Sequence, residues 1–395
     1  MSINPLWDTA FWGCYSYSSE QALFRWASFI GIARQYQPIL LLESGGQGTG
    51  GSSLQATAPC GMGRANRTEP IRARVDWIEA MAHLAPLEGK LVVLIGGGGF
   101  VGKHLAEELL RHGARLRIAE RHPEKAFQLR PLANLGQIQF ARCDVTKPRS
   151  IEAAVQGADA VVYLTATWGS DRRALNADGA GDAAAFAATQ GAEAFVYISS
   201  IGADPTSDSG FASTKGEGEV LVRAAFPRAT IVRPSVIFGE DDRFVNLFAG
   251  AIAALPVLPV FGPHTKVQII SVDDVAEAIA NALADPAKHG GKTYELAGPE
   301  VVTMDELHHR IAAAQGRERG FIQVPDTLSR LFAALPGTPM TSDQWTMLER
   351  GNVVSGAFPG CAALGVHPKP LGLFLDKWMT RYRKHGRFGV RNEPA

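Results

Sequence analysis

The sequence has no excess of either charge, because its 39 Lys and Arg residues balance 39 Asp and Glu residues. It is also poor in cysteine, with four in 395 residues, at Cys14, Cys60, Cys143 and Cys361. The charge balance gives no sign of a nucleic-acid or acidic partner. The four cysteines form no CxxC pair, so they argue against a disulfide scaffold and a zinc site and fit a reducing compartment.

Long apolar runs are missing as well. The longest candidate, Leu247–Phe261, is interrupted by Pro256 and Pro259 and is shorter than the ~18 to 20 residues that a membrane-spanning helix needs. The N-terminus lacks the order of basic, apolar and small residues of a secretory signal, and Asp8 and Glu20 disfavour a mitochondrial presequence. These absences favour a cytoplasmic protein of bacterial origin.

Residues 1–85 differ from the rest of the chain. Gly and Ser dominate Glu43–Ser53, and the residues that follow show no sustained periodicity. We therefore predict a poorly ordered extension, or an upstream stretch translated in error, since Met81 stands just before the first convincing strand. A small docked element built on the N-terminal aromatic residues is the alternative.

From residue 90 onward, short β-branched runs alternate with helical patterns. Such alternation predicts βαβ units with right-handed crossovers. The expected fold class is α/β, with a Rossmann-type doubly wound parallel sheet in a nucleotide-binding domain over residues 86–240. Residues 241–395 are expected to form a smaller lobe, interleaved with the sheet through a returning strand near Val267–Leu283, and to end in a basic tail. The expected strands are Leu91–Gly96, Arg115–Glu120, Ile138–Val145, Asp159–Ala166, Phe195–Ser200 and Ala229–Gly239.

A glycine-rich turn, IGGGGFVG, joins the first expected strand to the first helix. Gly96, Gly99 and Gly102 allow a tight turn, the approach of backbone to a pyrophosphate, and close packing of the helix on the sheet. The unpaired N–H groups and the positive dipole end of that helix favour phosphate. A glycine pattern alone is weak, but a strand and a helix flank this one, so it predicts dinucleotide binding rather than a simple turn.

The end of the second strand, AERHPEK, bears on which dinucleotide is bound. Arginine there accommodates the additional phosphate of NADP, whereas an acidic residue binds the ribose hydroxyl of NAD. Arg121 favours NADP(H), and Glu120 keeps NAD(H) open as the alternative. At the end of the third strand, Asp144 and Val145 are candidate adenine contacts; the alternative for Asp144 is a cap for the next helix.

The stretch SGFASTK, Ser209–Lys215, occupies the place where nicotinamide-dependent dehydrogenases often keep a tyrosine four residues before a lysine. In that arrangement the lysine lowers the pKa of the phenol and binds ribose, and a serine orients the substrate oxygen. Ser199 and Lys215 remain, but Phe211 cannot carry a proton, so we assign no catalytic residue. The alternative is a reductase in which Lys215, or an acid within residues 204–208, replaces the phenol.

Three short motifs, GGGGFVG, CDV and FVYISSIGAD, resemble the extended and atypical short-chain dehydrogenase superfamily. A closer resemblance is to the nucleotide-binding accessory subunits of respiratory complex I (NADH:ubiquinone oxidoreductase), in their bacterial form. It rests on Arg233–Ala249, Val301–Ala312 and Met340–Val354, and FGEDDRFVNLF is its most specific part. The resemblance implies an NADP(H) that is structural and not turned over. The implied nucleotide contacts are Gly96, Gly99, Phe100, Val101, Gly102, Arg121, Asp144, Val145 and Lys215.

The same resemblance implies docking to subunits of complex I, peripherally on the cytoplasmic side of the bacterial inner membrane. Two proline-broken apolar stretches, Asn246–Pro263 and Leu328–Met340, would form either core and cleft or a contact with lipid or a partner subunit. The basic C-terminal segment is a candidate contact for anionic lipid head groups, with a solvated tail as the alternative. The segment runs from Lys377 to Arg391, and its candidate lipid contacts are Lys377, Arg381, Arg383, Lys384 and Arg387.

Three functions follow from these patterns. The one we favour is a non-catalytic NADP(H)-binding accessory subunit that stabilises or assembles complex I. The alternatives are a reductase that works without the tyrosine, and a nucleotide-sensing regulator of a soluble partner. No metal site and no contact with nucleic acid are expected.

Overall fold

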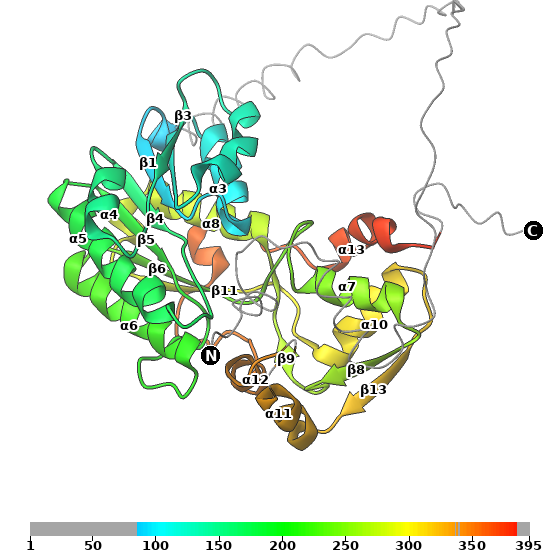
Figure 1. Ribbon diagram of the computed structural model, residues 1–395. Coiled ribbons are helices and arrows are strands. Elements are labelled where there is room, and N and C mark those ends of the chain that lie inside the picture. Colours follow the sequence, from blue (N-terminus) through cyan, green and yellow to red (C-terminus); the bar gives the residue numbers. More distant parts are fainter. Residues whose placement is uncertain (1–84, 336, 339, 385–395) are drawn as a thin grey trace, which may run out of the picture.

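The computed structural model describes residues 85–335, 337–338 and 340–384, so nearly all of the N-terminal extension predicted over residues 1–85 lies outside the described residues. A seven-stranded sheet lies beside a smaller lobe (Figure 1). The sheet consists of β1 (Leu91–Ile95), β2 (Arg115–Glu120), β3 (Ile138–Arg142), β4 (Ala160–Tyr163), β5 (Ala194–Ile198), β6 (Thr230–Pro234) and β11 (Thr293–Leu296).

All neighbouring strands in this sheet are parallel, in the order β3-β2-β1-β4-β5-β6-β11. The order reverses between β1 and β4, which is the topological switch point of a doubly wound sheet. The predicted fold class is therefore confirmed. The central strands are buried on both faces, which explains why the sequence of β1 is an unbroken apolar run and does not alternate with polar residues.

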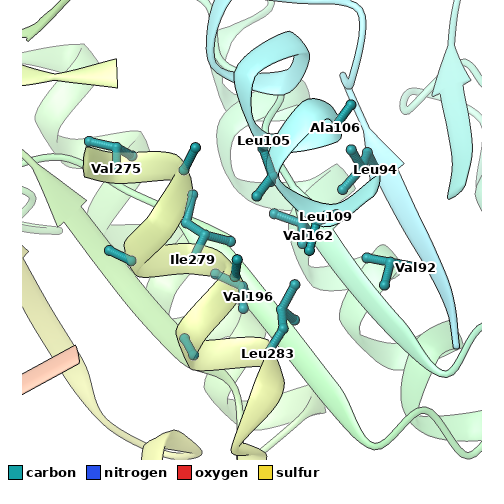
Figure 2. Close-up of a cluster of buried hydrophobic side chains, with 14 of the residues drawn as sticks. Val92, Leu94, Leu105, Ala106, Leu109, Val162, Val196, Val275, Ile279 and Leu283 are labelled. Carbon is teal, nitrogen blue, oxygen red and sulfur yellow. The ribbon is translucent and has the colours of Figure 1, made fainter. Parts of the chain in front are cut away.

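Side chains of each strand alternate between two helical layers. Val92 and Leu94 of β1 face α3 (Phe100–Arg111) and α8 (Val272–Ala284), whereas Val93 and Ile95 face α4 (Pro148–Val155), α5 (Gly179–Thr189) and α6 (Gly210–Ala225). Figure 2 shows the first of these layers, in which apolar side chains of α3 and α8 pack together on the same face of the sheet. Packing of these two helices fixes the start of α3 above the ends of the strands.

The smaller lobe has an apolar core of its own, which surrounds the buried ring of Trp345. A two-stranded parallel ribbon, β8 with β13, packs beside its helices. The lobe contains α7 (Val245–Ala254), β8 (Val257–Phe261), β9 (Lys266–Val267), β12 (Val302–Thr303), α10 (Met304–Ala314), β13 (Gly320–Val324), α11 (Asp326–Ala334), α12 (Ser342–Glu349) and α13 (Gly372–Trp378).

Shorter elements complete the chain. A parallel pair, β7 with β10, lies next to the sheet, and α9 follows α8. The bounds are β7 (Ile237–Phe238), β10 (Ile270–Ser271), α9 (Pro286–His289), η1 (Ala85–Leu87), η2 (Pro123–Leu132), η3 (Arg173–Asp178), η4 (Cys361–Leu364) and η5 (Met379–Tyr382).

The returning segment differs from the prediction in one respect. The sequence placed a returning strand near Val267–Leu283, but most of that stretch forms helix α8, and its strands β9 and β10 have two residues each. The strand that joins the main sheet is β11, which pairs with β6. The apolar residues of Val272–Ala284 recur at helical spacing, which is why this stretch covers the sheet and does not extend it.

The two proline-broken apolar stretches have different environments. In the first, α7 buries Ala249 and Ile252 in the core of the lobe. In the second, α11 exposes Leu328, Leu331 and Leu335, the middle one to 60%. Among the described helices, none is both long and apolar enough to cross a membrane.

The packing of α8 gives a prediction for stability. Ile279 is fully buried between α3 and the sheet, so Ile279→Ala should lower the free energy of unfolding by about 2–5 kcal/mol. Urea unfolding of the full chain measures this. Leu373→Ala, at a site that is 67% exposed, is the control and should change the free energy by about 0.5 kcal/mol or less. Equal urea midpoints for the two variants would contradict the burial of Ile279 between α3 and the sheet.

Candidate functional site

A cavity of about 410 Å³ opens at the carboxyl ends of β1, β4, β5 and β6. Gly96, Thr165, Ser199 and Ser235 each follow one of these strands and line it. Because the carboxyl ends of parallel strands meet at one edge of a sheet, residues far apart in sequence converge there. The lobe closes the other side of the cavity with Met347 and Leu348 of α12 and the residues that follow.

The glycine turn between β1 and α3 leaves no room for side chains. Gly96 has φ +86°, and a Cβ there would lie 3.0 Å from Thr165 Oγ1. A Cβ on Gly102 would lie 2.5 Å from the carbonyl oxygen of Gly97. The first N–H groups of a helix have no intrahelical partners, and those of α3 start at this turn. The turn is therefore a backbone cradle that suits a pyrophosphate.

The predicted glycine-turn contacts divide into two groups. Gly96, Gly99, Phe100 and Val101 line the cavity. Gly102 does not line it and acts from behind, by allowing α3 to approach the turn.

The end of β2 forms one side of the cavity mouth. The Glu120 carboxylate accepts a hydrogen bond of 2.7 Å from the backbone N–H of Gly98, and burial raises the pKa of Glu120. Arg121 and Lys125 also line the mouth and are exposed. Glu120 thus holds the glycine turn in place, and the cations Arg121 and Lys125 lie beside it at the mouth.

The structure does not bring Asp144 and Val145 into the cavity lining. The Asp144 carboxylate accepts hydrogen bonds from the backbone N–H (3.2 Å) and hydroxyl (2.8 Å) of Thr146, and these hydrogen bonds lower its pKa. Lys147 lies 3.3 Å away. Asp144 therefore closes the turn before α4. The N-cap of α4 is Lys147, so Asp144 is not the helix cap that the sequence gave as the alternative.

Phe211, which stands where related dehydrogenases keep a tyrosine, lines the end of the cavity opposite the glycine turn. Its ring stacks on Trp168, with 4.0 Å between ring centroids and 6° between planes. The backbone N–H of Phe211 donates to Asp343 of α12 at 3.1 Å. Two aromatic rings therefore fill the space in which an acid would meet a substrate, and they bring no ionisable group.

Ser199 and Lys215 line the cavity, and the side chain of each is hydrogen-bonded to another group of the protein. The Ser199 hydroxyl donates to Glu219 at 2.5 Å, and Glu219 accepts two hydrogen bonds of 2.8 Å from Arg233. Lys215 is 2% exposed, and its Nζ donates to the carbonyl oxygen of Ile198 at 2.7 Å. The arrangement can present an ammonium group to a ribose hydroxyl.

The loop acids that the sequence offered as replacements for the missing phenol lie outside the cavity. Asp204 accepts hydrogen bonds of 2.8 Å from the backbone N–H and the hydroxyl of Thr206, and Asp208 pairs with Arg350. Neither lines the cavity. Tyr163 and Tyr197 are fully buried and donate to backbone carbonyls, as expected for core residues. Among the described residues, no group of three His, Cys, Asp or Glu side chains could hold a metal.

Several lining residues were not anticipated from the sequence. Trp168 lies in an irregular segment after β4, where no pattern marks it. Asp241, Asp242 and Arg243 belong to FGEDDRF, which the sequence singled out without assigning it a role. Asn352, from the Met340–Val354 motif, accepts a hydrogen bond of 2.7 Å from the backbone N–H of Val236 at the cavity. Residues 340–354 therefore form the segment that closes this side of the cavity, which we call the strap.

Comparisons with known proteins agree with this geometry. The model of a family described as NAD(P)H-binding matches residues 96–286. Proteins named NADH dehydrogenase (ubiquinone) 1 alpha subcomplex subunit 9, mitochondrial, are similar: that of Mus musculus is 32% identical over 76% of this chain and 82% of its own. That of Dictyostelium discoideum is 33% identical over 55% of this chain and 62% of its own.

A bacterial protein is similar too. A ceramide reductase of Caulobacter vibrioides is 31% identical over 60% of this chain and 74% of its own. Among solved structures, an epimerase of Methanothermobacter thermautotrophicus superposes with a TM-score of 0.58, at 16% identity, over 76% of this chain and 94% of its own. The structural likeness supports the fold. The complex I relatives are named as mitochondrial, so they do not support the bacterial form expected from the sequence.

The glycine turn gives a prediction that needs no ligand. Gly102→Ala should lower the free energy of unfolding by about 1–3 kcal/mol, because its Cβ would overlap Gly97 and push α3 away. Gly372→Ala is the matched control, since a Cβ there would meet nothing within 4 Å. Thermal unfolding of both variants measures the difference. A Gly102→Ala chain as stable as Gly372→Ala would show that α3 does not start in contact with the turn.

Proposed function

Because the chain belongs to the NAD(P)-binding, atypical short-chain dehydrogenase family of these relatives, we propose that it is an accessory subunit of NADH:ubiquinone oxidoreductase that holds a nucleotide without turning it over. The observation that carries this proposal is the pairing of a complete glycine cradle at one end of the cavity with a stacked Phe211–Trp168 pair at the other. The first end suits a pyrophosphate, and the second has a phenyl ring where the phenol would stand.

The residues present fit a dinucleotide. Gly96, Gly99, Phe100 and Val101 would face the pyrophosphate, and Gly102 lets the helix approach. Lys215 would bind the ribose nearest the nicotinamide. When bound, the nicotinamide supplies a hydride donor or acceptor. The protein around it orients the ring and excludes water, and it offers no acid at position 211 for a carbonyl substrate.

NADP(H) is the nucleotide that we favour. Arg121 and Lys125 together place two cations at the mouth, whereas the Glu120 carboxylate is already bonded to Gly98. A phosphate gains from two cations, and a ribose hydroxyl would have to compete for Glu120. NAD(H) remains the alternative if Glu120 turns toward the ribose. An adenine contact at Asp144 and Val145 receives no support from the lining of the cavity.

The proposed partners are subunits of complex I, with docking through the smaller lobe on the cytoplasmic side of the bacterial inner membrane. The lobe offers the exposed leucines of α11. Of the basic residues proposed to contact anionic lipid, Lys377 and Lys384 are the candidates that remain, and both are exposed. Arg381 and Arg383 donate hydrogen bonds to their own chain, and Arg387 lies outside the described residues.

A reductase is the second candidate. The bacterial relative named ceramide reductase favours it, as does the presence of Lys215 in the cavity. In that case Lys215 would have to act as the proton carrier, although its bond to Ile198 holds it. Replacing a positioned general acid typically costs ~10²- to 10⁴-fold in rate, so such a reductase would be slow.

Nucleotide choice is testable with purified protein. Titration calorimetry should give tighter binding of NADPH than of NADH. Arg121→Ala should weaken NADPH binding by about 10- to 100-fold, since a hydrogen bond to a charged group contributes ~1.5–3 kcal/mol, and should leave NADH binding nearly unchanged. Arg149→Ala removes an exposed arginine outside the cavity and is the control. Equal losses for both nucleotides would mean that Arg121 does not contact the second ribose phosphate.

The subunit proposal predicts where the protein is found. In gently solubilised energy-coupling membranes, native mass spectrometry should detect it within NADH:ubiquinone oxidoreductase, together with one bound NADPH. Recovery of the whole population in the soluble fraction would overturn the proposal. Steady NADPH oxidation by the purified chain, abolished by Lys215→Ala, would favour the reductase instead.

A further inference from the structure

The Gly239–Asn246 loop, which includes the first two residues of α7, carries all of the FGEDDRF motif except Phe238 and has two faces. On one face, Asp241, Asp242, Arg243 and Phe244 form a wall of the cavity. On the other, the loop contacts η5 near the C-terminal end of the described chain. The loop therefore contacts both the cavity and the basic C-terminal segment.

On the cavity side, the loop is tied to the first turns of α3. The Asp241 carboxylate lies 3.6 Å from Lys103 and 3.5 Å from His104, and His104 also contacts Asp273 of α8 at 2.7 Å. A Cβ on Gly239 would lie 2.9 Å from the ring of Phe100. The loop therefore packs on the same helix whose first N–H groups form the phosphate cradle.

The interior of the loop is held by its own hydrogen bonds. Asp242 is buried, and its carboxylate accepts from the backbone N–H groups of Gly239 (3.0 Å) and Val245 (2.7 Å). The Asn246 amide donates to the carbonyl oxygens of Glu240 (3.1 Å) and Asp242 (3.0 Å). These hydrogen bonds join the two faces of the loop, so that shifting one face would break bonds that hold the other.

On the face of the loop away from the cavity, the Asn246 side chain contacts η5 of the C-terminal segment. Its side-chain oxygen accepts hydrogen bonds from the Tyr382 hydroxyl (3.0 Å) and from Arg381, and Arg381 also donates to the carbonyl oxygen of Glu240. Neither Asn246 nor the two η5 residues line the cavity. They contact the nucleotide site only through the loop.

We propose that the Gly239–Asn246 loop couples nucleotide binding to the attachment of residues 379–384, so that a bound nucleotide favours the arrangement in which Arg381 and Tyr382 are held against the loop. This rests on the proposed function, because it assumes that the cavity holds a dinucleotide. A ligand that contacts the Asp241–Phe244 wall favours the arrangement in which the loop is closed. That arrangement is also the one that bonds Arg381 and Tyr382. Linkage then requires that detaching η5 weakens nucleotide binding by the same factor.

The affinity arm of the test uses the full chain and NADPH. Arg381→Ala should weaken NADPH binding by about 5-fold or more, although Arg381 lies outside the cavity. Tyr382→Phe, which removes only the hydroxyl, should give a smaller loss of about 2-fold. Lys377→Ala removes an equally exposed charge from the neighbouring helix and should leave the affinity unchanged. Thermal unfolding of each variant establishes that it is folded.

The second arm measures amide hydrogen exchange in residues 379–384. NADPH should slow this exchange in the unaltered chain and have no effect on it in Asn246→Ala, even where the nucleotide is present at saturation. If the unaltered chain binds NADPH but the exchange is unchanged and Arg381→Ala binds as tightly as Lys377→Ala, the coupling is overturned and the proposed function stands. If the unaltered chain does not bind NADPH or NADH, both fail.

Discussion

The contact between Gly102 and the carbonyl of Gly97 determines where α3 begins, and the rest of the site depends on that point. Only hydrogen fits between the two backbones, so the helix starts directly above the end of β1. Its first turns then present Lys103 and His104 toward the FGEDDRF loop, as well as N–H groups toward the cavity. If α3 started one residue later, these groups would point in other directions, because each residue rotates the helix by about 100°.

Most polar groups at the opposite end of the cavity serve the structure. Ser199 is bonded to Glu219, which in turn holds Arg233 in a two-point ion pair. A partly buried ion pair of this kind needs its hydrogen bonds complete, since an unpaired charge there is strongly destabilising. Lys215 is bonded to the backbone. The protein therefore holds these side chains in one arrangement.

The smaller lobe acts on the site through two segments. The strap formed by α12 and the following turn closes the cavity through Asp343, Met347 and Asn352, and the FGEDDRF loop forms another wall. The adjacent α11 exposes its leucines away from the site. The lobe therefore combines a face toward the cavity with an apolar face toward solvent.

The sequence by itself determined the fold class, the glycine cradle and the loss of the proton carrier at Phe211, because each depends on local properties: strand and helix periodicity, the space that glycine leaves, and the chemistry of one ring. It also marked FGEDDRF and Met340–Val354 as unusual. Only the tertiary structure decided that Asp144 closes a turn, that Glu120 is bonded to the glycine turn, and that Trp168 covers Phe211. It also placed the returning strand at β11 and tied Arg381 to Asn246. These contacts join residues distant in sequence, and their partners are set by how the sheet, α3 and the lobe pack, which no local pattern encodes.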